Sequence, residues 1–134
     1  MRLLISLVMA LIVVLPARAG EPEDSIQGVI ADQIAAFQRS DLEAAFAHAS
    51  PTIQKRFQTP GRFGQMVSGD YPMIWRPSRW EMLSLENFSG TLVQIVFFED
   101  RQGEQFEAAY EMIQVDGIWR INGVQLRRLP GITS

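Results

Sequence analysis

The spacing of apolar residues changes once along this chain, from a helical period to a strand period, and this change limits the fold more than any other feature. From Ser25 to Phe37 the apolar side chains recur at intervals of three and four residues, as in an amphipathic helix. After the aromatic, proline-bounded segment 71–77 they alternate, which is typical of strands. The chain is therefore predicted to be α+β, with N-terminal helices packed into a curved antiparallel sheet of about four strands.

Further short helices are predicted after the first, and capping residues mark their starts. Asp41, Ser50 and Thr59 each precede a short segment with helical spacing. Proline follows the last two of them, at the first helical position, where its missing N–H costs nothing. The acidic segment 21–24 is expected to be a loose lead-in. Helices this short are not stable alone, so we expect them to pack against the sheet.

Strands are predicted at 79–86, 91–99 and 105–115, and a fourth follows Asp116-Gly117. An Asp-Gly pair between two strands indicates a tight hairpin, whose register would set Gly123 opposite Tyr110. The segment 91–99 is apolar on both faces. It is therefore expected to be central and covered on both faces, or to lie in an interface.

The first nineteen residues have the pattern of a cleavable signal peptide. Arg2 precedes an apolar run at 3–15, and Ala17-Arg18-Ala19 has the small-x-small form of a cleavage site. The run is shorter than the roughly 20 residues that a membrane-spanning helix needs, so no stable membrane anchor is expected after cleavage. An uncleaved anchor is the alternative. We expect a single exported domain at 20–134, periplasmic if the source is Gram-negative and otherwise secreted.

Composition excludes several kinds of chemistry. The chain has no cysteine and one histidine, His48, which excludes thiolate zinc sites, iron–sulfur clusters and sites with several histidines. We expect no metal and no cofactor. Removal of residues 1–19 takes away Arg2 and Arg18, so ten of twelve basic and all fifteen acidic residues remain, a net charge of −5. That charge argues against nucleic acid as a partner.

The order of elements resembles the nuclear-transport-factor-2-like superfamily, in which helices pack into a curved sheet to form a cone. More narrowly, the chain is similar to the bacterial domain-of-unknown-function family 4864, over nearly all of 20–134. The matching residues are Ile34-Ala35-Ala36-Phe37, Asp41 with Ala45-Phe46, Ala49-Ser50-Pro51, Phe63 with Met66-Val67, Tyr71, and Ala109-Tyr110 with Met112. They are mostly core and cap residues, so the resemblance implies a fold and an apolar pocket at the cone mouth, and it implies no particular reaction.

Tyr71, Trp75 and Tyr110 are the candidate ligand-binding residues, since tyrosine and tryptophan can line a cavity and offer a polar tip. The alternative is that they are ordinary core residues. The predicted function is non-enzymatic binding of a small apolar ligand or a protein partner at the cone mouth. No catalytic residue is nominated.

Two alternative functions stay open. In the first, the domain is an isomerase- or hydratase-like enzyme that uses His48, Asp41 or a tyrosine in the pocket. Against it, Asp41 fits a helix cap and a lone histidine fits a helix end. In the second, the two-sided apolar segment 91–99 joins two copies of the chain into a structural homodimer.

Overall fold

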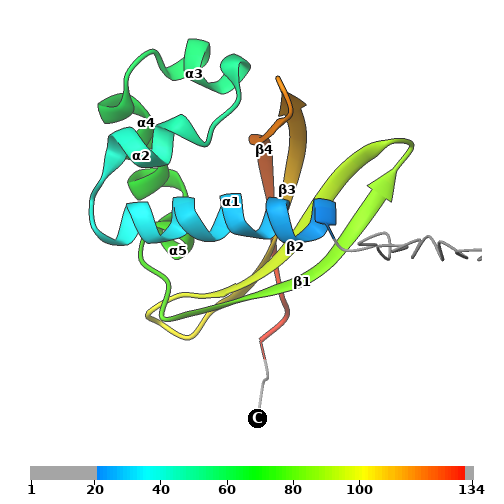
Figure 1. Ribbon diagram of the computed structural model, residues 1–134. Coiled ribbons are helices and arrows are strands. Elements are labelled where there is room, and N and C mark those ends of the chain that lie inside the picture. The colour runs from blue at the N-terminus through cyan, green and yellow to red at the C-terminus, as the bar shows by residue number, and fades with distance from the viewer. Residues whose placement is uncertain (1–20, 132–134) are drawn as a thin grey trace, which may run out of the picture.

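The computed structural model describes residues 21–131, and within that range five helices precede four strands (Figure 1). The elements are α1 (Glu21–Gln38), α2 (Leu42–Ala47), α3 (Pro51–Phe57), α4 (Pro60–Asp70), α5 (Pro72–Trp75), β1 (Arg79–Phe88), β2 (Thr91–Glu99), β3 (Gln105–Val115) and β4 (Ile118–Arg128). The predicted α+β class is confirmed. The predicted signal peptide at 1–19 lies outside the described residues. None of the described helices combines the length and the apolar character that crossing a membrane requires.

The predicted helix caps are confirmed. The side chains of Asp41, Ser50 and Thr59 each accept a hydrogen bond from the backbone N–H three residues further on, at 3.1, 3.3 and 3.2 Å. Each cap satisfies one of the backbone donors that a helix start leaves without a partner. These caps fix where α2, α3 and α4 begin.

One expectation for the helical half is wrong. Segment 21–24 belongs to α1 and is not a loose lead-in. Glu23 and Asp24 favour the helix, because a negative charge near a helix N-terminus interacts well with the backbone dipoles, and Pro22 is tolerated in the first turn. The proline-bounded segment 71–77, for which no helix or strand was predicted, contains the four-residue helix α5.

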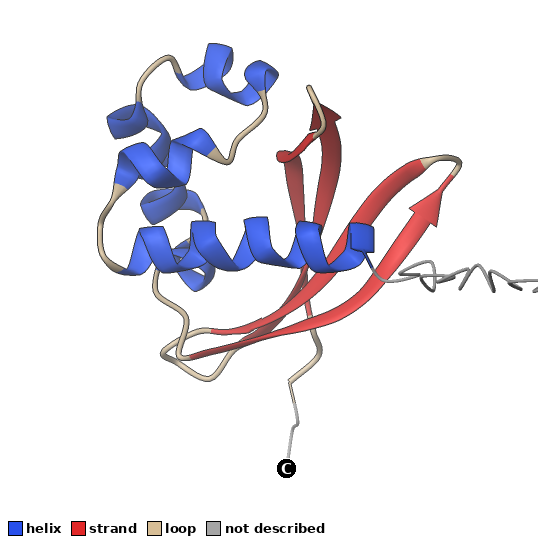
Figure 2. Cartoon of the chain, in the orientation of Figure 1, coloured by secondary structure: helices blue, strands red, loops and turns tan. Residues whose placement is uncertain are grey.

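The four strands form one antiparallel sheet in the order β1-β2-β3-β4. Figure 2 shows the sheet bending strongly, with α1 lying across its concave side and the shorter helices gathered at one end of α1. A bulge between Met82 and Leu85 contributes to this bend in β1. Buried Gln94 fastens the bulge to the core, since its Nε2 donates to the carbonyls of Leu83 and Ser84 at 3.4 and 3.3 Å.

The register of the last hairpin departs from the prediction beyond a second bulge. The four pairs nearest the Asp-Gly turn are as predicted, and an extra residue, Asn122, then interrupts β4. Tyr110 consequently pairs with Val124, and the expectation that Gly123 sits opposite Tyr110 is wrong. An Asp-Gly turn predicts which residues of the two strands pair only up to the first bulge in the hydrogen-bond ladder.

Strand β2 lies in the middle of the sheet, yet helices cover only one of its faces. Gln94, Val96 and Phe98 are buried against the helices. On the opposite face Val93, Ile95 and Phe97 are half-buried. The expectation of cover on both faces is therefore wrong for the isolated chain, and the interface alternative stays a prediction.

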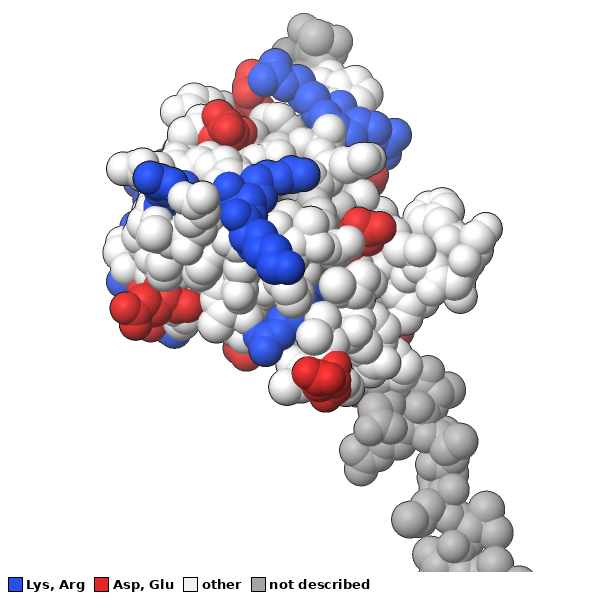
Figure 3. Space-filling view, turned by 90° about the horizontal axis from the view of Figure 1, so that it is seen from above, with Lys and Arg blue, Asp and Glu red and all other residues white. Residues whose placement is uncertain are grey.

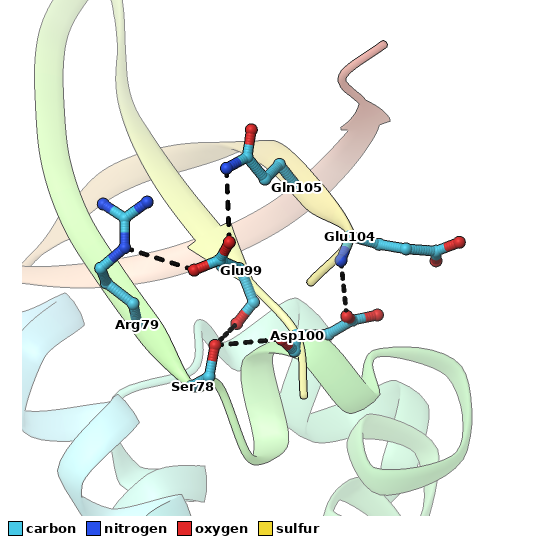
Figure 4. Close-up of polar contacts among 6 residues, drawn as sticks. All are labelled: Ser78, Arg79, Glu99, Asp100, Glu104 and Gln105. Carbon is cyan, nitrogen blue, oxygen red and sulfur yellow. Dashed lines mark hydrogen bonds and ion pairs between the residues drawn. The ribbon is translucent and has the colours of Figure 1, made fainter. Parts of the chain in front are cut away.

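Polar contacts close the end of the sheet where β2 turns into β3 (Figure 4). The carboxylate of Glu99 accepts hydrogen bonds from Arg79 Nε at 3.3 Å and from Gln105 Nε2 at 3.4 Å. In the turn, Asp100 Oδ1 accepts from the backbone N–H of Glu104 at 2.9 Å. The carboxylates of Glu99 and Asp100 therefore stabilise this end of the sheet, where β1, β2 and β3 meet.

Candidate functional site

A cavity of about 460 Å³ lies between the helices and the last two strands. Its walls come from α1, α3, α4, α5, β3 and β4. The apolar part of the wall includes Phe37, Ile53, Phe57, Phe63, Val67 and Ile74. Sites for small molecules are typically about 300–1,000 Å³ and mainly apolar, so the cavity has the size and lining of such a site.

Phe63 organises the aromatic side of this cavity. Its ring centroid lies 5.9 Å from Phe37, 5.4 Å from Phe46 and 5.9 Å from Phe57, in tilted or edge-on arrangements. Aromatic pairs at these separations attract one another beyond simple burial. Rings from α1, α3 and α4 therefore stabilise one another at this wall, and Phe46 of α2 supports Phe63 from outside the lining.

Charged groups occur only at the open side of the cavity. Among the lining residues Arg56 of α3 and Asp70 of α4 carry charge, and both are exposed. Within residues 21–131 neither of them forms an ion pair. Figure 3, viewed from the α3 end, shows basic and acidic side chains interspersed over a mostly uncharged surface. The mouth is thus polar with both signs of charge, and the interior is neutral.

Tyr110 of β3 forms part of the inner wall and is fully buried. Its hydroxyl has no hydrogen-bond partner among the described residues. Burial raises the pKa of this hydroxyl above its ordinary value, so it stays protonated and can act as a donor. Leaving a buried polar group without a partner costs about 1–3 kcal/mol, which makes this hydroxyl an unusual feature of a stable core.

The bulge in β4 brings Asn122 to the cavity wall. Its Oδ1 accepts a hydrogen bond from Ser50 Oγ at 2.8 Å, and its Nδ2 donates to Glu111 Oε2 at 3.3 Å. Ser50 also caps α3, so one short chain of hydrogen bonds links the start of α3 to the bulge. Bulges of this kind are common beside functional sites, where they redirect a side chain.

The structure brings together two of the three candidate ligand-binding residues. Tyr71 and Tyr110 both line the cavity, from the end of α4 and from β3. Trp75 does not line it. The Trp75 ring packs on Phe37 with centroids 5.5 Å apart, and the Arg76 guanidinium lies over the Trp75 ring, 4.6 Å from its centroid.

Neither His48 nor Asp41 lines the cavity. Asp41 caps α2, and His48 is half-buried at the end of that helix. Burial lowers the pKa of His48, Asp32 opposes this by favouring the charged form, and Arg120 adds to the lowering. The two acid–base groups named from the sequence are therefore not placed to act on a molecule in the cavity.

In residues 21–131 no group of three or more histidine, cysteine or acidic side chains is placed to hold a metal ion. The polar lining residues carry hydroxyl, amide, guanidinium and single carboxylate groups, as in Tyr71, Asn122, Arg56 and Asp70. This set suits hydrogen bonding to an organic molecule.

The fold and the cavity define a class: a small α+β domain in which helices close the concave side of a curved sheet around an apolar pocket. The chain belongs to the family described as Domain of unknown function (DUF4864), whose model matches residues 20–133. The resemblance to that family is confirmed, and the architecture is compatible with the nuclear-transport-factor-2-like superfamily. No match was found among curated proteins. The family description names no activity, so function has to be argued from the site.

Proposed function

We propose that this domain binds a small, mainly apolar molecule in the cavity and performs no chemistry on it. The cavity itself is the observation that carries the proposal, because a mainly apolar space of about 460 Å³ between the helices and the sheet has the size of a small-molecule site. Removal of an apolar molecule from water into such a space supplies the free energy of binding. The aromatic rings of Phe37, Phe57 and Phe63 form one side of this space.

An enzymatic role is less well supported by the same geometry. Proton transfer needs a base within hydrogen-bond reach of the substrate. His48 and Asp41 stand outside the cavity, so of the residues named for this alternative only a tyrosine remains in the wall. We therefore favour binding over an isomerase- or hydratase-like reaction.

A dye-binding experiment tests the proposal. The uncharged fluorescent dye phenylnaphthylamine is expected to bind the wild-type domain saturably, with one molecule per chain. Val124→Phe adds a ring to the cavity wall and is expected to weaken binding by about tenfold or more. Val93→Phe makes the same change at a half-buried strand valine on the opposite face of the sheet, and serves as the control. Equal affinity in all three proteins would show that the cavity is not the binding site.

The proposal includes export of the domain. The family match begins at residue 20, the first residue after the predicted cleavage point. The intact mass of protein recovered from outside the cytoplasm is expected to correspond to a chain that begins at Gly20. A mass that still includes residues 1–19 would contradict cleavage.

Self-association through the sheet is the second candidate function. Val93, Ile95 and Phe97 follow one another along the uncovered face of β2. An apolar strip on a free sheet face gains free energy when a second surface covers it.

A further inference from the structure

Positive charge gathers where α3 is followed by α4. The segment 44–69 contains no aspartate or glutamate, although the chain as a whole has a net charge of −3. The lysine and arginine residues of this segment are Lys55, Arg56 and Arg62, and all are exposed. Arg62 donates a hydrogen bond to the side chain of Gln58, so its guanidinium lies beside the end of α3. In the part of the chain that the structure describes, none of the three forms an ion pair, so the protein leaves this charge without a partner.

Of these three basic residues, Arg56 lines the cavity. The lining residues of α3 are Thr52, Ile53, Arg56 and Phe57, and their spacing is that of one helical face. Lys55 lies in the same last turn of α3 and does not line the cavity. An arginine can lay its aliphatic stem along apolar groups and keep its guanidinium in water. Arg56 is therefore placed to meet the polar end of a molecule whose apolar part lies in the cavity.

The other charged lining residue, Asp70, has the opposite sign and lies at the end of α4. The segment 44–70 nevertheless has three basic residues and one acidic residue, which favours an anion over a cation at the mouth. A negative group deeper in the cavity would lose its hydration without meeting an opposite charge, which is strongly unfavourable. The cavity thus suits a molecule with an apolar body and a negative group at its outer end.

Resting on the proposed function, we propose that the cavity takes an apolar molecule with one negatively charged group, such as a carboxylate or a sulfonate, and that Arg56 binds this group at the mouth. A planar guanidinium can donate two parallel hydrogen bonds to two oxygens of such a group. The contact decides which end of the molecule enters, because the apolar body gains free energy inside the cavity and the charged group keeps its hydration at the mouth.

Two dyes that differ by one sulfonate group test this inference. Phenylnaphthylamine is uncharged, and anilinonaphthalene sulfonate carries a sulfonate on the same skeleton. Each dye is titrated separately against wild type, Arg56→Gln, Arg56→Lys and Lys55→Gln in about 0.15 M salt, where charges more than about 8 Å apart are largely screened. The measured quantity is the dissociation constant of the neutral dye divided by that of the sulfonate dye, because this ratio cancels effects of a substitution that both dyes share.

The ratio is expected to fall by about two- to fivefold in Arg56→Gln, as loss of one exposed ion pair implies. Arg56→Lys keeps the charge and should give a higher ratio than Arg56→Gln. Lys55→Gln removes the same charge from the same helical turn, outside the cavity lining, and should leave the ratio near its wild-type value. Both residues are exposed, so these variants are expected to fold, and thermal unfolding checks this.

Three results would overturn the inference and leave the proposed function in place. An unchanged ratio in Arg56→Gln would mean that this residue does not contact the sulfonate. Equal falls in Arg56→Gln and Lys55→Gln would indicate attraction by the surface charge in general. Equally tight binding of the sulfonate dye to Val124→Phe and to wild type would place that dye outside the cavity. Failure of both dyes to bind wild-type protein would overturn the proposed function together with this inference.

Discussion

At the scale of single residues, His48 couples the stability of the fold to pH. Burial lowers the pKa of His48 in the folded chain below its ordinary value of 6.5, and the groups facing it are Asp32 and Arg120. The unfolded chain therefore takes up the proton more readily. Above pH 6.5 His48 does not reduce the free energy of unfolding. Below that pH the free energy of unfolding declines, because protonation of His48 then favours the unfolded chain.

Between pH 7.5 and 5.5, on either side of the ordinary histidine pKa of about 6.5, the free energy of unfolding is expected to drop in wild type and to drop less in His48→Gln. Urea denaturation at both pH values measures it. His48 is the single histidine of the chain, and the carboxylates are common to both proteins, so the difference between the slopes isolates this residue. Identical slopes would show that folding does not perturb its titration.

Some cavity residues can be predicted from the sequence and others cannot, because only some of them have a side chain whose chemistry suggests a binding site. Tyr71 and Tyr110 could be nominated because an aromatic ring with a polar tip is a chemical signal in itself. Arg56 and Asp70 have no such signal, since exposed charged residues on helices are common. Their place at the mouth depends on how helices far apart in sequence come together, and spacing does not contain that information.

At the scale of elements, prediction succeeds where local chemistry decides the structure and fails where distant contacts decide it. The caps of α2, α3 and α4 and the bounds of β2 and β3 follow from neighbouring residues, and they agree with the structure. The bulge at Asn122 does not follow, because it is stabilised by Ser50 and Glu111 from other elements. One extra residue there changes the partner of Tyr110, and with it the wall of the cavity.

Two helical glycines are expected to differ in how alanine changes the stability of the fold. Gly28 of α1 is exposed, and a Cβ there would meet nothing within 4 Å, so Gly28→Ala should raise the free energy of unfolding by about 0.5–1 kcal/mol. At buried Gly64 of α4 the same atom would lie 2.6 Å from Leu42 Cδ2. Forcing Leu42 aside costs about 1–3 kcal/mol, so Gly64→Ala should be the less stable variant by at least about 1 kcal/mol.

Chemical denaturation of the two alanine variants beside wild type gives both values. Equal gains in Gly28→Ala and Gly64→Ala would show that α2 and α4 are not in close contact at this point. That result would also question the wall of the cavity, because α4 supplies Phe63 and Val67 to it.

At the scale of the whole molecule, the curvature of the sheet gives its two faces different roles. The concave face carries the core and the cavity, while the other face carries the half-buried strip of Val93, Ile95 and Phe97. Arg79 partly covers the end of this strip, with its guanidinium 4.7 Å from the centroid of Phe97. The strip is thus apolar along β2 and bordered by charge, as expected of a surface that a second copy covers.

If the strip joins two copies, light scattering at micromolar concentration should give twice the mass of one chain. Ile95→Glu places a carboxylate in the middle of the strip, where a second copy would have to bury it, so this variant should have the mass of one chain. Ile118→Glu makes the same change at an exposed position of the β3–β4 hairpin, beyond the end of β2, and should keep the mass of wild type. A wild-type mass of one chain would remove self-association as a function and leave the cavity to carry the whole role of the domain.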